Sequence, residues 1–238
     1  MITAPYWGPA SRLVFQSDEH RYFLDGREIP SNTTMIKAAG LIDDRWFTPE
    51  SRQRGIEVHR ACHFLCEKDL DWTTVRPDYV PYVEACQDFI RSTGFQVERN
   101  EFPAWSDHDY ATTPDVMGIL NGRRSIINFK TGAISKWVGL QLYGEKQAVN
   151  ERIQNQDEPW TAGLTYLNGH PYPEMVYALE LRANGKWKLH PFNERDLTQV
   201  FLSMVKLHHW NGVETPEITH SRLVLNQWKE ENGYRAAA

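Results

Sequence analysis

The alternation of apolar and polar positions predicts β-strands in the middle of the chain and again towards its end. Apolar runs at residues 112–120 and 125–130 lie on either side of Asn121-Gly122, and those at 175–182 and 186–191 flank Asn184-Gly185. An Asn-Gly pair readily adopts the left-handed backbone of tight antiparallel turns, so each pair of runs predicts a β-hairpin. Further strands are predicted at residues 13–16, 21–24 and 95–103.

Three- and four-residue spacing of apolar positions predicts helices between these strands. Thr48-Pro49-Glu50 combines an N-cap, a proline at the first helical position and an acid near the positive helix end, so a helix should run from here to about Lys68. One face of this helix is predicted to carry Ile56, His59, Cys62, His63 and Cys66. Other helices are predicted at residues 35–39, 77–93, 136–152 and 194–210, the last capped by Asn193, with a loosely packed helix and tail after them. This order of elements indicates a mixed α/β fold with an antiparallel-rich central sheet flanked by helices, in a single domain over 1–238 whose core spans about 21–210.

Composition places the chain among globular proteins and excludes few functions. Hydrophobic residues make up 41% of the 238 residues and charged residues 24%, which is ordinary for a soluble domain. The net charge of −5 gives no overall basic footprint, but a local basic groove could still bind nucleic acid. No segment reaches the roughly 20 apolar residues of a membrane span, and the three cysteines are expected to be packed, reduced thiols. A cytoplasmic protein is therefore expected.

Residues 115–130 bring chemically useful side chains to one place. On the second strand of the predicted hairpin, Asn128 and Lys130 face the same way. Asp115 lies on the partner strand, where cross-strand neighbours are roughly 5 Å apart. A carboxylate and an amide oxygen suit a hard divalent cation, and a lysine beside them can orient a water or a phosphate oxygen.

These residues carry a resemblance to a known family. The chain resembles the PD-(D/E)xK nuclease signature between residues 114 and 130. Pro114-Asp115 is followed, after twelve residues, by Asn128-Phe129-Lys130, with Asn where an acid is expected. Five further segments resemble the phage exonuclease and RecB-type branch of that superfamily: Arg54-Gly55 with His59, Lys130-Thr131-Gly132, Gln141 with Tyr143, and the stretches 22–26 and 30–34. The spacing of Gln141 and Tyr143 departs from the usual Gln-x-x-x-Tyr. The resemblance extends from about Arg21 to about Trp210 and implies a restriction-endonuclease-like core.

The resemblance implies Mg²⁺- or Mn²⁺-dependent phosphodiester hydrolysis and a role for each matched residue. The implied metal ligands are Asp115, His59, position 128, the Phe129 carbonyl and, through water, Glu101. Lys130 would assist the attacking water, and Gln141 would keep the site in order. Together Asp115, Asn128, Lys130 and Gln141 form the implied catalytic set.

The substrate implied by the resemblance is linear double-stranded DNA, digested from one end for recombination. Arg52, Arg54, Arg123 and Arg124 could form a phosphate-binding rim, although such arginines could equally form a solvated face. Thr33, Thr34 and Lys37 could bind a 5′-phosphorylated end at a helix N-terminus. The resemblance also implies a single-strand annealing protein as partner and a ring-shaped homo-oligomer. For a phage-encoded enzyme, the expected location is the bacterial host cytoplasm.

Asn128 is the departure that matters most. It keeps the shape of Asp but removes a negative charge, and deleting one key stabilising group lowers rates by roughly 10²–10³. An engineered Asp→Asn change would explain why every other element is retained. A catalytically inactive DNA-binding or anti-defence protein on the same fold is the alternative, and a metal-independent α/β binding module is a third.

Overall fold

The structure is a computed structural model that describes residues 11–16, 19–42, 47–164, 166–192 and 197–234. Its centre is a five-stranded sheet of order β10-β9-β8-β7-β4. The strands are β4 (Gln96–Asn100), β7 (Val116–Leu120), β8 (Arg123–Lys130), β9 (Met175–Leu181) and β10 (Trp187–Pro191). Neighbouring strands are antiparallel except β8 and β9, which are parallel. The predicted mixed α/β class with an antiparallel-rich sheet is therefore confirmed.

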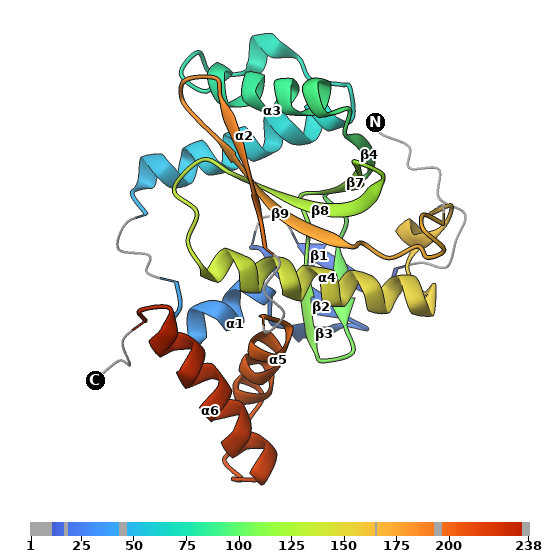
Figure 1. The fold of residues 1–238 in the computed structure, drawn as a ribbon. Coiled ribbons are helices and arrows are strands. Elements are labelled where there is room, and N and C mark those ends of the chain that lie inside the picture. Colours follow the sequence, from blue (N-terminus) through green and yellow to red (C-terminus); the bar gives the residue numbers. More distant parts are fainter. Residues whose placement is uncertain (1–10, 17–18, 43–46, 165, 193–196, 235–238) are drawn as a thin grey trace.

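Both predicted hairpins form. Between β7 and β8 the turn consists of Asn121 and Gly122 alone, with φ of 50° and 74°, the left-handed values that a two-residue turn requires. β9 and β10 form the second hairpin around Gly185. The parallel pairing of β8 with β9 was not predicted. It requires a crossover, and helix α4 (Trp137–Asn155) provides it across one face of the sheet (Figure 1).

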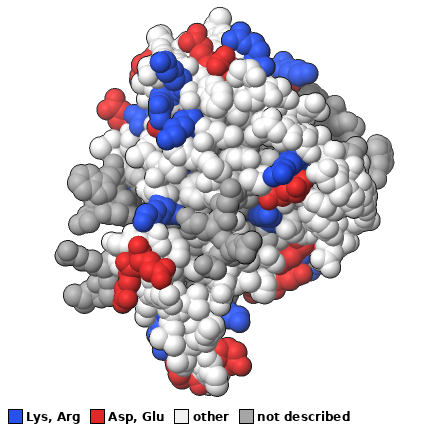
Figure 2. Space-filling model, viewed as in Figure 1, with Lys and Arg blue, Asp and Glu red and all other residues white. Residues whose placement is uncertain are grey.

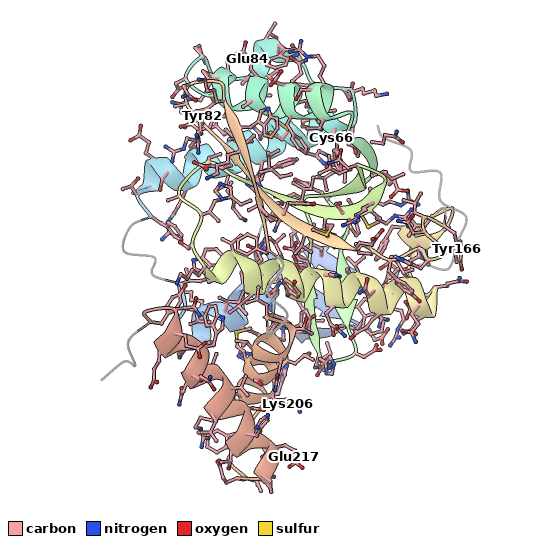
Figure 3. All side chains as sticks on the ribbon, viewed as in Figure 1. Cys66, Tyr82, Glu84, Tyr166, Lys206 and Glu217 are labelled. Atoms are coloured by element: carbon pink, nitrogen blue, oxygen red, sulfur yellow. The ribbon has the colours of Figure 1, made fainter. Side chains whose placement is uncertain are left out.

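Helices cover both faces of the central sheet (Figure 1). One layer consists of α2 (Pro49–Cys66) and α3 (Val80–Thr93), where Figure 3 labels Cys66 and Tyr82. The other layer consists of α4 with α1 (Asn32–Ala38) and α5 (Leu197–His208). A last helix, α6 (Pro216–Glu231), packs on α5, and Figure 3 labels Lys206 and Glu217 on this pair.

An apolar core lies on each side of the sheet, as the alternation along β8 requires. Ile127 and Phe129 pack into the core under α2 and α3, whereas Ile126 packs into the core under α4 and α5. Asn128 follows Ile126 on the α4 side and is fully buried. The predicted sharing of one face by alternate β8 residues therefore holds.

Two small sheets complete the fold. The first consists of β1 (Leu13–Gln16), β2 (Arg21–Leu24) and β3 (Arg27–Ile29), and the second of β5 (Ala104–Ser106) and β6 (Tyr110–Thr112). The strand predicted at 95–103 is shorter than expected, because Glu101 has a φ of 44° and turns the chain away after Asn100. Likewise, residue 112 belongs to β6 and not to the β7 hairpin.

The helices differ from prediction mainly at their ends. Thr48 caps α2 as predicted, but Ile56 is 63% exposed, so it does not belong to the buried face. The helix predicted from residue 77 begins only at Val80, and the predicted last helix forms as α6, capped by Thr215. The predicted cap at Asn193 lies outside the described residues. Among the helices described, none combines the length and the apolar character that crossing a membrane would need.

Candidate active site

The candidate site lies at the open end of the β7–β8 hairpin, away from its turn. Asp115 immediately precedes β7, and Val116 pairs with Ile127, so Asp115 and Asn128 are cross-strand neighbours. The Asp115 backbone N–H donates to Asn128 Oδ1 (3.2 Å), and the Phe129 N–H donates to Asp115 Oδ2 (2.7 Å). The hairpin thus brings the two residues together as the sequence predicts.

His59 reaches the same carboxylate from helix α2. Its Nδ1 lies 3.4 Å from Asp115 Oδ2, and its ring packs edge-on against Phe129 with centroids 6.0 Å apart. Burial by itself would raise the pKa of Asp115, but His59, Lys130 and the Phe129 N–H together lower it below its usual value. Asp115 is therefore ionised at neutral pH despite its burial.

On the other side of Asn128 lies Glu145, a residue that the sequence analysis missed. The Asn128 side-chain amide donates to Glu145 Oε1 (2.8 Å), and Gln141 Nε2 donates to the same oxygen (3.0 Å). Gln141 in turn accepts a hydrogen bond from Lys130 Nζ (3.3 Å). A continuous chain of contacts thus joins Asn128 to Lys130 through two residues of α4.

Glu145 is fully buried, and burial raises its pKa to about 8 in spite of the Asn128 hydrogen bond. Its second oxygen, Oε2, has no hydrogen-bond partner among the residues that the structure describes. The spacing could have revealed Glu145, because it stands four residues after Gln141 and so on the same helix face. Tyr143 instead points away, donating its hydroxyl to the Phe192 carbonyl (3.2 Å).

Glu101 reaches the site through its backbone. Its N–H donates to the Asp115 carbonyl (2.9 Å), while its carboxylate lies 3.6 Å from His63 Nδ1. Burial is the main cause that raises the pKa of Glu101, His63 opposes it, and the nearby charge of Asp115 raises it further. The ring of His63 also contacts the Asn100 side-chain amide at 2.7 Å. Glu101 and His63 therefore form a neighbouring pair, and the Glu101 backbone joins this pair to Asp115.

A cavity of about 660 Å³ opens beside the site. His59 and Lys130 belong to its wall, which also carries Arg54 and the aromatic rings of Phe47 and Trp137. Within the described part of the chain, the buried Nε of Arg54 has no hydrogen-bond partner. Arg52, on the same helix, lies over the Phe47 ring at 5.9 Å. The cavity thus joins a basic and aromatic wall to the candidate active site.

The structure overturns the predicted role of Arg124 in a phosphate-binding rim. Arg124 is 0% exposed and donates to both carboxylate oxygens of Glu98 (2.7 Å each) and to the Pro171 carbonyl (2.6 Å). The turn contains only Asn121 and Gly122, so Arg123 and Arg124 both belong to strand β8. Neighbouring strand residues face opposite sides of the sheet, and Arg124 therefore points into the protein. Arg123 faces outward and its side chain is 59% exposed.

The residues predicted to bind a phosphate on α1 do not gather at one end of the helix. This helix has seven residues, and Ser31 already caps it by accepting from the Thr34 N–H (3.0 Å). Lys37 lies in the last turn, towards the helix end opposite the free N–H groups. Neither Lys37 nor Thr33 lines the cavity beside His59.

The candidate metal ligands at this site carry little negative charge. In the described ranges no three His, Cys, Asp or Glu side chains stand together as a metal-binding group. The third group beside Asp115 and His59 is the amide of Asn128, whose Oδ1 accepts a hydrogen bond from the Asp115 backbone N–H. Carboxylate and amide oxygens are ligand types that hard divalent cations accept, but this donor set supplies only one carboxylate, that of Asp115.

Figure 2 shows Lys and Arg in several separate groups on one face of the molecule, with Asp and Glu among them. No protein-family model and no curated protein matches the chain. Among solved structures, a crystal structure named "putative exonuclease" from Eubacterium rectale is 12% identical, with a TM-score of 0.41, over 88% of this chain and 77% of the other. A likeness this loose supports no conclusion about activity.

Proposed function

We propose that the protein is a metal-dependent DNA nuclease of the PD-(D/E)xK type, acting as an exonuclease on linear double-stranded DNA. One observation supports this above all others. Asp115, Asn128 and Lys130 converge at one end of a hairpin, and His59 arrives from a separate helix 3.4 Å from the Asp115 carboxylate. This is the arrangement that the resemblance implies for the metal and the attacking water.

The residues present suggest a division of labour. Asp115, His59 and the Asn128 oxygen would hold Mg²⁺ or Mn²⁺, which when bound neutralises charge on the phosphate and favours hydroxide formation. Lys130, held by Gln141, places an ammonium beside this point to orient a water or a phosphate oxygen. The cavity wall beyond it offers Arg54 for phosphate and the Trp137 ring for a base.

The test compares the unmodified chain with Asn128→Asp and Asp115→Asn on linear and covalently closed circular duplexes, with Mg²⁺ and Mn²⁺. We expect Asn128→Asp to degrade linear DNA strongly and to leave circles intact. Asp115→Asn should lower the rate of DNA cleavage by roughly 10²–10³ relative to the unmodified chain. Asp88→Asn is the control, since Asp88 lies on α3 and pairs with Arg91 and Trp187. Folded Asn128→Asp protein that leaves linear DNA intact with both metals would refute the proposal.

A second candidate function is that of a catalytically inactive DNA-binding protein. The observation that favours it is the fit of the asparagine itself, because both ends of its side chain are hydrogen-bonded, to Glu145 and to the Asp115 N–H. A gel shift separates the two functions. The inactive protein would bind DNA tightly, and an aspartate at position 128 would add no cleavage.

A further inference from the structure

A row of charged side chains crosses the central sheet beside the candidate active site. Lys130 of β8 pairs in register with Glu180 of β9, and Glu180 pairs in register with Lys188 of β10. Residues paired in register point to the same face of a sheet, and Lys130 shares its face with Asn128, two residues before it. Because β10 is the edge strand, the row leads from the candidate site to the edge of the sheet.

A second cavity, of about 580 Å³, lies at the outer end of this row and is here termed the β10 groove. Its wall includes the side chains of Lys136, Lys188 and His190 and the half-buried ring of Phe192. Lys136 stands at the start of α4, whereas the other three residues belong to β10 or follow it directly. The β10 groove therefore combines basic side chains with an aromatic ring.

The β10 groove adjoins the cavity that carries His59. Ala133 and Ser135, both in the loop between β8 and α4, line the two cavities at once. This loop follows directly after Lys130, the lysine of the candidate active site. One extended ligand can therefore occupy the β10 groove and reach the candidate site.

The two lysines of the groove are not neutralised by the protein. Glu180 lies in register beside Lys188, but its carboxylate accepts two hydrogen bonds from Arg182 (2.9 Å each) and lies 2.8 Å from His190 Nε2. Among the residues that the structure describes, neither Lys136 nor Lys188 forms an ion pair, and both side chains are exposed. The groove is thus a locally positive site on a chain whose net charge is −5.

We propose that the β10 groove binds single-stranded DNA, with Lys136 and Lys188 on its phosphates and the Phe192 ring against a base. A positive groove that tracks the backbone, together with an aromatic ring for stacking, is how proteins hold a single strand without reading its sequence. Two strand spacings, roughly 10 Å, separate the backbones of Lys130 and Lys188, which corresponds to about three nucleotide steps of a stacked strand. One strand therefore spans the distance from the candidate site to the groove. This inference rests on the proposed function, which places the reacting phosphate beside Lys130.

The test measures the affinity for a fluorescein-labelled thymidine oligonucleotide by fluorescence anisotropy, without divalent metal, for the unmodified chain and for Lys136→Ala/Lys188→Ala. Each phosphate contact with a single strand contributes about 0.7 to the slope of log affinity against log salt concentration. Loss of two contacts should lower the steepness of this slope by about 1.4. Between about 50 and about 200 mM salt, the unmodified chain should therefore lose about sevenfold more affinity than the variant.

Lys68→Ala/Lys206→Ala is the matched control, because it removes the same charge from two exposed lysines outside the groove. Lys68 follows α2, and Lys206 lies on α5 (Figure 3). This pair should leave the affinity and the salt slope unchanged. Lys136→Arg/Lys188→Arg should keep the slope, since arginine also binds phosphate. Circular dichroism verifies that each variant is folded.

An unchanged salt slope for Lys136→Ala/Lys188→Ala would overturn the inference, as would an equal fall in the control pair or no binding of the oligonucleotide by the unmodified chain. The readout is binding and needs no cleavage, so the two proposals fail separately. If the slopes change as expected but Asn128→Asp leaves linear DNA intact, the nuclease proposal fails and this one stands. If Asn128→Asp cleaves linear DNA while the slope is unchanged, only this inference fails.

Discussion

Replacing Arg124 by methionine should destabilise the fold strongly. The Arg124 side chain is 0% exposed and that of Glu98 only 15%. The Arg124 guanidinium donates three hydrogen bonds, two to the Glu98 carboxylate and one to the Pro171 carbonyl. Removing one partner of a buried ion pair leaves an uncompensated charge and costs about 3–5 kcal/mol. At roughly 2–4 °C per kcal/mol for a chain of this size, the melting temperature should fall by roughly 6–20 °C.

Urea unfolding followed by circular dichroism measures the loss, with Arg123→Met as the matched control. Arg123 is the neighbouring residue, 59% exposed and 3.9 Å from Glu174, so its loss should cost at most about 1 kcal/mol. The double change Glu98→Leu/Arg124→Met should recover most of the stability, because it removes both charges together. A loss below about 1 kcal/mol for Arg124→Met, or similar losses for both arginines, would refute the reasoning.

Three further predictions concern the framework of the site. Gly118→Ala should cost about 1–3 kcal/mol in urea unfolding, because the added Cβ would lie 2.2 Å from the Gln96 backbone oxygen; an unchanged midpoint would contradict it. Thr48→Ala removes the cap of α2 and should cost about 1 kcal/mol by the same assay, and a neutral result would show that the cap contributes nothing. The pKa of Glu180 is lowered to about 2, chiefly by its hydrogen bond from Arg182. Its carboxylate therefore stabilises the fold above the ordinary value of 4.5, and this contribution is lost as pH falls towards 2. The stability difference between the unmodified chain and Glu180→Gln should shrink over that interval, and a difference that grows on acidification would disprove the assignment.

Local rules determined those parts of the protein that depend on neighbours in the chain. The two-residue period of β8 placed Asn128 and Ile126 on one face, and the Asn121-Gly122 turn set the register that puts Asp115 beside Asn128. The cap at Thr48 likewise located the start of the helix that carries His59. These features follow from backbone conformation, which a few adjacent residues decide.

Tertiary structure decided what each side chain meets. Arg124 and Arg123 are adjacent in sequence, yet only the former finds a buried carboxylate, on a strand 26 residues away. Glu145 meets Asn128 because the crossover between β8 and β9 lays α4 over the face that carries Asn128. Burial and pairing depend on how the whole chain packs, and no short window of sequence contains that information.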